Sequence, residues 1–479
     1  MDCRTYVTTS IPYVNGRPHV GFALELVQAD VIARHHRLLG RQTRLQTGAD
    51  ENAFKNVLAA RDQGLETGEL VGRNAKLFRR LGEALHIAAD DFVRTTEERH
   101  CRAVQSLWRQ LRPGDVYQKN YRGLYCTGCE DFYLERDLED GRCPEHDAPP
   151  IEVEESNYFF RLSAYQERIE AWIDAGEVRI EPAERRREIL NFVRSGLRDI
   201  SVSRDTRRVQ GWGIPVPDDA SQIVYVWIDA LINYISGPGY GSGEDWRETW
   251  REGVRKIHVI GKNVWKFHAV YWPALLLSAG LPLPDEILVH GFLTEDGFKI
   301  SKSRGGSVDP FVCVERYGAD GVRYYLLRAV SAFADGDFSR ERLDQLYHAD
   351  LANGLGNLVS RLTALAERGG CGPWNFVHVP HPPAGYTEAL ERYAFDRALE
   401  SLWAVVGRIN REIDANRPWE WLKRGEKQEL GECLERWFGD LYGVAYWLAP
   451  FLPEASWRIV EVLERHEIKA FNSLFPRQI

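Results

Sequence analysis

Long apolar runs, a disulfide framework and an excess of positive charge are all missing from this chain of 479 residues. No stretch approaches the roughly 18 apolar residues that a membrane-spanning helix needs, and the start lacks the basic and then apolar pattern of a signal peptide. We therefore expect a cytoplasmic protein with no membrane partner. The net charge of −9 gives no overall attraction for a polyanion, so any nucleic acid has to be bound through local contacts.

The remaining composition is that of an ordinary folded protein, with 44% hydrophobic and 27% charged residues. The length is sufficient for about three domains. Eight cysteines in so long a chain do not form a disulfide scaffold, and three of them cluster near a histidine, which predicts a metal site in a reducing compartment. No internal repeat or low-complexity tract is present, which excludes a solenoid.

The apolar pattern at the N-terminal end predicts a parallel α/β sheet. β-Branched and aromatic residues over 5–14 precede a helical pattern over 19–40. An extended stretch over 41–50 precedes a second helical pattern over 51–65. Strands that alternate with helices are typical of a parallel sheet.

A segment of different pattern interrupts this order. Residues 117–215 consist of short, turn-rich pieces around the cysteine cluster, followed by a charged helical pattern over 181–197. The order of strand and helix returns over 223–235 and 255–280, so we expect a sheet that is split by an insert.

The last part of the chain is expected to be a helical bundle. Beyond about residue 345, long amphipathic helices such as 351–369 and 393–418 are separated by short Gly and Pro breaks. The predicted segments are 1–116 for the first half of the α/β domain, 117–215 for the insert, 216–345 for the second half and a connecting segment, and 346–479 for the bundle.

Four potential metal ligands lie in two pairs of equal spacing. Two residues separate Cys126 from Cys129, and Cys143 and His146 repeat this spacing after an intervening thirteen residues. Three thiolates and one imidazole suit tetrahedral Zn²⁺. The alternative, four unrelated reduced residues, is disfavoured because such paired spacing on both sides of a loop is uncommon by accident. Four protein ligands leave no open position, so the predicted zinc ion is structural.

Two further motifs suit phosphate binding. His19 and Gly21 lie at the start of a predicted helix, whose dipole and free N–H groups favour negative charge. Lys299, Ser301 and Lys302 lie on a short segment that ends in glycine, and its cations can gather around a triphosphate. Taken singly, the first motif also suits a surface histidine before a helix, and the second a solvated basic loop.

In this order, the three elements resemble the methionyl-tRNA synthetases, a family of class I aminoacyl-tRNA synthetases, over nearly the whole chain. PYVNGRPHVGFALE is similar to the first signature, normally His-x-Gly-His, and HGFLTEDGFKISKS to the mobile Lys-x-Ser-Lys-Ser loop. LYCTGCEDFYLERDLEDGRCPEH is similar to the family's zinc knuckle. VYVWIDALINYI, GKNVWKFHAVYWPALL and RYGADGVRYYLLR also look like family segments. The resemblance implies an α/β fold: a Rossmann-type catalytic domain split by a zinc-knuckle insert, followed by an all-α bundle.

The resemblance also implies the residues of the active site. An Asp holds the α-ammonium group of the amino acid, and aromatic and apolar residues enclose its thioether. The amino-acid-binding positions are Ser10, Ile11, Tyr13, Asp50, Trp227, Ala230, Leu231, Tyr234, Val264 and His268. The ATP-binding positions are His19, Gly21, Phe22, Asn263, Lys299, Ser301 and Lys302. The catalytic positions are His19, Lys299, Lys302 and Arg204, the last of which matches an Arg near the substrate carboxylate. For any single aromatic residue, packing in the core of the sheet is the alternative.

In the bundle, Asn357, Arg361 and Trp419 match positions that contact anticodon bases. An Asn or Arg can hydrogen-bond with an unpaired base edge, and a Trp can stack on its face. A helix cap or a core Trp is the alternative. The resemblance implies ATP, Mg²⁺ and structural Zn²⁺ as cofactors, and methionine, ATP and tRNA as partners. We expect a monomer, because the chain ends without the C-terminal dimerisation module of some relatives.

Three features depart from the family pattern. Phe22 replaces the second His of the first signature, Asn263 replaces a ribose-contacting Asp, and the usual His-Gly is absent after Asp50 and Glu51. We expect an aminoacyl-tRNA ligase that forms methionyl-adenylate and transfers methionine to tRNA. The departures leave two alternatives open. One is a paralogue that passes an activated amino acid to a small-molecule acceptor, for example in nitrogen–nitrogen bond formation, and the other is a catalytically silent RNA-binding relative.

Overall fold

The computed structural model describes residues 4–126, 131–133, 135, 138–144, 147–243, 245–295, 298–299, 308–376, 378–471 and 473–477, without the side chains of 131, 132, 295, 298 and 299. The chain folds into two compact units. Unit 1 consists of Met1–Pro18, Arg41–Arg80 and Ala89–Val289, and unit 2 of His19–Gly40, Leu81–Ala88 and His290–Ile479. In the part of the chain that the structure describes, no helix is both long and apolar enough to cross a membrane.

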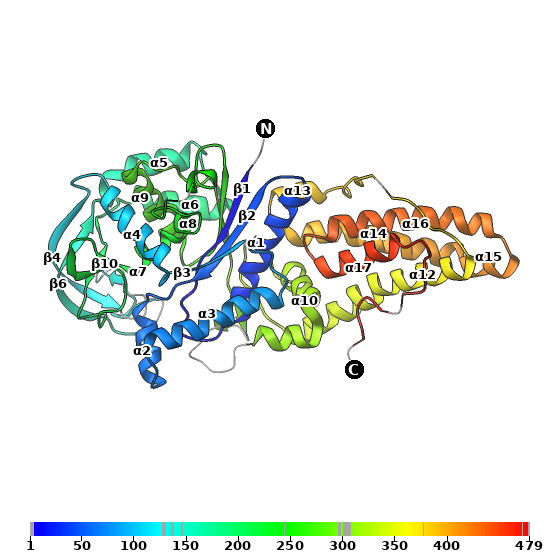
Figure 1. Cartoon of the computed structure of the whole chain (residues 1–479), viewed down its shortest axis with the longest axis horizontal. Helices are drawn as coiled ribbons and strands as arrows, with labels where there is room; N and C mark the ends of the chain where they lie inside the picture. The colour runs from blue at the N-terminus through cyan, green and yellow to red at the C-terminus, as the bar shows by residue number, and fades with distance from the viewer. Residues whose placement is uncertain are drawn as a thin grey trace. The chain divides into compact units, whose positions relative to one another are not determined.

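Unit 1 is built on a six-stranded sheet in the order β3-β2-β1-β12-β13-β7. Strand β1 runs parallel to both β2 and β12, and Figure 1 shows β1 and β2 as adjacent strands. All five residues of β1 (TYVTT) are buried, which suits a central strand that is covered on both faces. The strands are β1 Thr5–Thr9, β2 Thr43–Ala49, β3 Asp91–Arg94, β7 Arg179–Glu181, β12 Arg255–Gly261 and β13 Glu286–His290.

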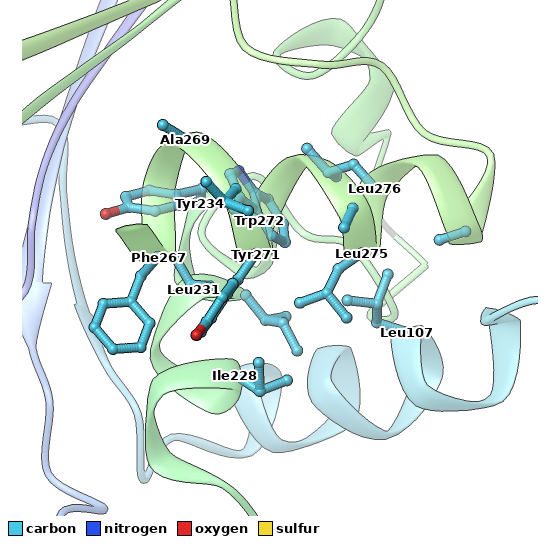
Figure 2. Close-up of a cluster of buried hydrophobic side chains, with 14 of the residues drawn as sticks. Leu107, Ile228, Leu231, Tyr234, Phe267, Ala269, Tyr271, Trp272, Leu275 and Leu276 are labelled. Atoms are coloured by element: carbon cyan, nitrogen blue, oxygen red, sulfur yellow. The ribbon is translucent and has the colours of Figure 1, made fainter. Parts of the chain in front are cut away.

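Helices of unit 1 pack around one large apolar cluster. Figure 2 shows part of it, with Leu107 of α4, Leu231 of α7 and Trp272 of α9 among its members. The helical segments are α2 Phe54–Asp62, α4 Glu98–Gln110, η2 Leu162–Tyr165, α5 Gln166–Asp174, α6 Ala183–Arg194, α7 Val226–Leu231, α8 Asn233–Ser236, η3 Trp246–Glu248, η4 Phe267–Tyr271 and α9 Trp272–Ala279. Helix α3, Thr67–Ala84, begins in unit 1 and ends in unit 2.

Two small antiparallel sheets lie largely within the predicted insert. One has the order β5-β4-β6-β8 and the other β10-β11-β9. The pairing of β4 with β6 extends over ten residue pairs, so the insert contains a long hairpin and not only short pieces. The strands are β4 Val116–Cys126, β5 Asp131–Tyr133, β6 Ile151–Phe160, β8 Ile200–Ser201, β9 Ser203–Asp205, β10 Pro215–Val216 and β11 Asp219–Val224.

Two strand assignments differ from the sequence-based expectation. The segment 223–235 was expected to begin with a strand of the parallel sheet. This strand is β11, and it pairs instead with β9 and β10 in an antiparallel sheet. Conversely, β7 lies within the predicted insert but pairs in parallel with β13 at the edge of the main sheet. Apolar periodicity identifies a strand but not its partner, because the partner is set by long-range packing.

Unit 2 combines helix α1 with a small sheet and the C-terminal helices. Strand β14 pairs in parallel with β16 and antiparallel with β15. The strands are β14 Leu293–Glu295, β15 Phe298–Lys299 and β16 Gly336–Asp337. The helices are α1 Val20–Leu38, α10 Pro310–Arg328, α11 Arg340–Leu346, the π-helical segment η5 Tyr347–Gly356, α12 Asn357–Gly369, α13 Tyr386–Glu391, α14 Phe395–Asn416, α15 Pro418–Arg424, α16 Lys427–Leu448 and α17 Pro453–Leu463.

The expected helical bundle is present in unit 2. Helix α16 packs against α12, α14 and α17, and Figure 1 shows these as long neighbouring helices. Leu399, Leu402, Val406, Ile409 and Ile413 form the buried face of α14, with steps of three and four residues. This spacing places them on one side of the helix, as predicted for an amphipathic helix.

Arg323 of α10 fixes helix α1 to the end of the bundle. Its Nη1 lies 2.7 Å from Oδ2 of Asp30, and both side chains are fully buried. Its Nε and Nη2 donate to the carbonyl groups of Phe451 and Pro450, at 2.7 and 2.8 Å. Because the buried charges are paired and hydrogen-bonded, the network holds α1 in a fixed place within unit 2.

Candidate active site

The predicted amino-acid-binding residues follow the carboxyl ends of three neighbouring strands in unit 1. Residues 10–13 follow β1, Asp50 follows β2, and Val264 lies just beyond β12. Ligands bind at this edge in open parallel sheets. The backbone joins the first two segments, because Asp50 N–H donates to the carbonyl of Pro12 at 2.9 Å and Tyr13 pairs with Asp50 as a β-bridge.

Asp50 is almost completely buried, with 1% of its surface exposed. The backbone N–H of Asn52 donates to its Oδ1 at 3.3 Å. The side-chain amide of Asn56 donates to its carbonyl oxygen at 3.2 Å, which holds the turn after β2. A buried carboxylate at the carboxyl end of a central strand can hold an ammonium group through its charge and hydrogen bonds.

Aromatic rings line the next part of the site. The rings of Tyr13 and Trp227 lie 5.6 Å apart, and Trp227 stacks on Phe267 at 4.0 Å with an interplanar angle of 8°. Phe267 is buried and was not among the predicted site residues, although it lies next to the predicted His268. Such faces suit an apolar, polarisable side chain.

Tyr234 and His268 form a hydrogen-bonded pair. The Tyr234 hydroxyl lies 2.6 Å from His268 Nε2, and Nδ1 of the same ring lies 2.9 Å from the carbonyl oxygen of Val264. Since a carbonyl can only accept, Nδ1 carries the proton and Nε2 accepts from the phenol. Burial lowers the pKa of His268 to about 4, so the ring is neutral at physiological pH.

His258 of β12 lies behind this pair. Its ring is 4.2 Å from that of Tyr234 and 5.9 Å from that of His268, and its Nδ1 is 2.6 Å from the Thr8 hydroxyl. Burial lowers the pKa of His258 well below its usual range, and the nearby His268 and Lys256 lower it further. Tyr234, His258 and His268 therefore form a cluster of neutral rings.

The remaining predicted residues of this half lie close in the chain to these groups. Ala230 and Leu231 are buried on and at the end of α7, and Val264 is buried before η4. Asn263 is exposed in the turn after β12, where Val264 N–H donates to the Gly261 carbonyl at 3.1 Å.

A buried polar network beside Asp50 was missed by the sequence analysis. Asp229 accepts from the Asn52 amide at 2.7 Å through Oδ2, and its Oδ1 lies 2.7 Å from His100 Nε2. His100 Nδ1 lies 2.8 Å from the Ser236 hydroxyl. Trp212 also donates to the carbonyl of Glu51 at 2.8 Å. One signal was available in the sequence: Asp229 is a lone acid in the apolar run VWIDAL, and such residues need buried partners.

Arg204 lies on β9 and is 4% exposed. Its Nη1 donates to the Ser201 hydroxyl at 2.9 Å and to the Ser203 carbonyl at 2.8 Å. Its guanidinium carbon is 4.0 Å from the centre of the Tyr225 ring. The structure thus holds this side chain within the antiparallel part of unit 1, and a role near the substrate carboxylate stays a prediction.

His19 in unit 2 is the N-cap residue of α1. Its Nδ1 accepts from the N–H of Gly21 at 3.1 Å, so its Nε2 carries the proton and can donate. A Cβ atom at Gly21 would lie 3.0 Å from the His19 ring, which explains the glycine. The N-terminus of a 19-residue helix and an N–H donor together suit a phosphate group.

The other predicted phosphate-contacting residues are only partly described. Phe22 is buried on α1 with 7% exposed. The backbone of Lys299 pairs with that of Thr294 in the β14–β15 hairpin, while its side chain lies outside the described residues. Ser301 and Lys302 also lie outside the described residues.

The predicted anticodon-contacting residues lie on two helices of the bundle. Asn357 is exposed at the start of α12, and Arg361 follows one turn later. Arg361 Nη2 lies 2.6 Å from Oδ1 of Asp414 near the end of α14. Trp419 is half-buried on α15, which packs against α12.

Half of the predicted zinc site is described. Cys126 ends β4 and Cys143 lies in a turn, and both thiols are buried and free of disulfide bonds. Strand β5 pairs Asp131 with Cys126, so the chain returns beside this cysteine. Cys129 and His146 lie outside the described residues, and the described ones contain no group of three potential metal ligands. Two buried, reduced thiols at a hairpin and a turn fit a zinc knuckle.

Comparison with known proteins identifies the family. A family model described as "tRNA synthetases class I (M)" matches residues 5–149 and 137–363. The chain belongs to this class I synthetase family. It is 40% identical to a methionine–tRNA ligase of Brucella suis, over 96% of this chain and 91% of that protein. It is 39% identical to the enzyme of that name from Thermotoga maritima, over 94% of this chain and 74% of that protein.

Solved structures agree with this assignment. The structure of Mycobacterium tuberculosis methionyl-tRNA synthetase bound by methionyl-adenylate superposes with a TM-score of 0.90 and 35% identity, and covers 99% of this chain and 100% of that one. The free form of the same enzyme gives a TM-score of 0.84. The class I synthetase fold and the family expected from the sequence are thereby confirmed.

Proposed function

We propose that this class I synthetase activates methionine with ATP to methionyl-adenylate and transfers the methionyl group to tRNA. The observation that carries the amino-acid assignment is the neutral Tyr234–His268 pair beside the Trp227 and Phe267 rings. These groups present apolar and polarisable ring faces, which suit a thioether. Asp50 supplies the counter-charge for the α-ammonium group.

Adenylate formation requires positioning more than proton transfer. The methionine carboxylate is already ionised at pH 7, so its oxygen attacks the α-phosphorus of ATP without a general base. The bond from that phosphorus to the bridging oxygen breaks, and pyrophosphate leaves in line. His19 donates from Nε2 to the phosphates at the N-terminus of α1, and Lys299 and Lys302 neutralise developing charge. Mg²⁺ supplies further charge neutralisation when bound.

The zinc ion has a structural role in this proposal. Cys126, Cys129, Cys143 and His146 would hold it with four protein ligands and no open position. Elemental analysis of the purified protein is expected to find one zinc per chain, and chelation is expected to disorder the part of the insert around β4 and β5 while the parallel sheet of unit 1 stays folded. Protein that contains no zinc after purification in zinc-supplemented medium would contradict this assignment.

The acceptor, the cellular location and the oligomeric state complete the proposal. We assign methionine tRNA as acceptor, with Asn357, Arg361 and Trp419 at the anticodon, in a cytoplasmic monomer. A second candidate, transfer to a small-molecule acceptor, is favoured by Phe22, which has no hydrogen-bonding group where the family has a His, and by Asn263, which has no charge where the family has an Asp.

Pyrophosphate exchange tests the first step. Labelled pyrophosphate should enter ATP only with methionine among the twenty amino acids, and a Asp50→Ala variant should lose exchange. Exchange that responds to another amino acid and not to methionine refutes the specificity. Charging of total tRNA then separates the acceptors, since adenylate formation without aminoacyl-tRNA selects the small-molecule alternative.

A further inference from the structure

Unit 1 contains a cavity near the amino-terminal ends of strands β12 and β13, whereas the proposed amino-acid site lies at the carboxyl ends of the strands. Its volume is about 420 Å³, within the range of about 300–1,000 Å³ that is usual for small-molecule sites. Its walls come from α4, from residues 240–251 before β12 and from residues 280–282 after α9. These two segments precede the strands β12 and β13, whereas the amino-acid site follows the carboxyl ends of β1, β2 and β12.

The walls of the cavity are held in place by specific contacts. The Tyr240 hydroxyl donates to Oε1 of Gln110 at 2.6 Å, and the rings of Tyr240 and Trp246 lie 5.1 Å apart at 81°. Trp250 is fully buried and donates from Nε1 to the carbonyl of Pro282 at 3.0 Å. A Cβ atom at Gly241, where φ is +76°, would lie 2.9 Å from the Ser106 hydroxyl, so only glycine lets this segment approach α4.

Positive charge lies beside these rings. Arg247 and Arg251 both line the cavity and are exposed. The guanidinium carbon of Arg247 lies 4.7 Å from the centre of the Trp246 ring. Among the described residues, neither arginine forms an ion pair with a carboxylate. Guanidinium groups bind carboxylates and phosphates through paired hydrogen bonds, and the aromatic walls suit a flat ring.

We propose that this cavity is a second binding site, for a flat aromatic compound that carries a carboxylate or phosphate. The ring of the compound lies against Trp246, whose position is fixed by Tyr240, and the anion is held by Arg247 and Arg251. Neither the family membership nor the proposed catalytic function requires this site.

Trp250 connects the cavity to the amino-acid site. Its ring stacks on His258 at 5.9 Å with an interplanar angle of 28°, and the His258 ring lies 4.2 Å from that of Tyr234. Tyr6 contacts both Trp250 and Tyr234. Its ring is 6.2 Å from that of Trp250, and its hydroxyl donates to the Tyr234 carbonyl at 3.0 Å. Because packed interiors transmit strain, we infer from these contacts that occupancy of the cavity changes the affinity for methionine.

Calorimetric titration of the full chain with three matched probes tests the site. The probes are 1-naphthyl phosphate, 1-naphthoate and the neutral 1-naphthol, which share one ring system. We expect at least one anion to bind and the neutral compound to bind at least about tenfold more weakly, because it lacks the charged hydrogen bonds. The stronger of the two anions identifies whether phosphate or carboxylate is preferred.

Variants place the binding in the cavity. The double variant Arg247→Gln/Arg251→Gln changes two exposed residues and should weaken binding of the preferred anion by about tenfold or more. Arg109→Gln, an exposed arginine on α4 outside the cavity, is the matched control and should bind as the wild type does. Failure of both anions to bind, equal binding of 1-naphthol, or wild-type binding by the double variant overturns the proposal.

The coupling has its own measurement. At saturating probe, the dissociation constant of methionine should change by about fivefold or more, the lower end of typical coupling between sites. This part rests on the proposed function, because it needs methionine to bind. If the probe binds and methionine affinity stays the same, the coupling is wrong while the site stands. If methionine does not bind with or without probe, the proposed function fails and the direct titration still decides the site.

Discussion

The Tyr234 hydroxyl donates to Nε2 of His268 over 2.6 Å, and the Val264 carbonyl fixes the opposite nitrogen of that ring. Both polar ends of the imidazole are therefore satisfied within the protein. The pair closes the apolar part of the proposed methionine site with its hydrogen-bonding groups already used, which favours a thioether over a more polar side chain of similar size.

Removal of this hydroxyl should weaken methionine binding. Tyr234→Phe keeps the ring but leaves His268 Nε2 as a buried acceptor without its donor, which costs about 1–3 kcal/mol. We expect the KM for methionine in pyrophosphate exchange to rise by roughly five- to a hundredfold, with a smaller change in kcat. Tyr117→Phe is the control, because it removes a hydroxyl that donates to Asp199 in the insert at 2.6 Å. An unchanged KM in Tyr234→Phe would show that the pair does not shape the site.

The stability of the protein should fall in weak acid. Burial lowers the pKa of His268 from 6.5 to about 4, so between these values the unfolded chain binds a proton that the folded chain does not. Stability therefore rises with pH across this window and is lost as the pH falls from about 6.5 towards 4, by roughly 3 kcal/mol for this group. Urea unfolding of wild type and His268→Gln at several pH values measures the difference. The free energy of unfolding of the variant should depend less steeply on pH than that of the wild type. If the two proteins show the same pH dependence, the lowered pKa of His268 is contradicted.

The buried carboxyl group of Asp320 should have the opposite effect on the pH dependence of stability. Burial raises the pKa of Asp320 to about 6, although its Oδ2 accepts from Ala455 N–H at 2.7 Å. Its Oδ1 has no hydrogen-bond partner among the described residues. A raised folded pKa means that the folded chain binds the extra proton, so this group stabilises below pH 3.8 and loses that contribution as the pH rises through 6.

Asp320→Asn tests this directly, because the amide keeps an acceptor for Ala455 and carries no charge. We expect the variant to be more stable than wild type at pH 7.5, by roughly 1–3 kcal/mol, and equal to it below pH 4. A variant that is less stable at pH 7.5 would mean that the charge is needed by Arg323, one turn away on α10.

Much of this architecture could be predicted from local sequence patterns. The features that could not be predicted all depend on contacts between residues far apart in the chain. The amphipathic spacing of α14 and the β-branched run of β1 were sufficient to predict both elements. The partners of β7 and β11 were not predictable, since strand pairing depends on residues far apart in the chain. The same holds for the site: Asp50 could be assigned through resemblance, whereas its buried neighbours Asp229 and His100 become visible only when the fold brings α4 and α7 together.

Phe22 offers a test of the first signature. Its ring cannot donate the hydrogen bond that a histidine would supply to a phosphate, and one such charged bond is worth about 1.5–3 kcal/mol. We expect Phe22→His to raise the rate of adenylate formation by about tenfold or more, measured by pyrophosphate exchange at saturating methionine. Because Phe22 is 7% exposed, a thermal unfolding curve has to show that the variant is folded. A folded variant with an unchanged or lower rate would favour a site rebuilt around the ring and a non-tRNA acceptor.

The bundle should bind RNA through a few local contacts. The ion pair with Asp414 orients the Arg361 guanidinium before any RNA arrives. Stacking of a base on an aromatic ring is worth about 1–3 kcal/mol, so Trp419→Ala should weaken methionine-tRNA binding by roughly ten- to a hundredfold. Pyrophosphate exchange without tRNA should stay at the wild-type rate, because none of the predicted methionine- and ATP-binding residues lies on α15. Trp457→Ala on α17 is the control, since it removes a Trp that is 62% exposed at another place on the bundle. If filter binding and charging are equal in both variants, the three residues do not contact the anticodon, and the acceptor has to be sought among small molecules.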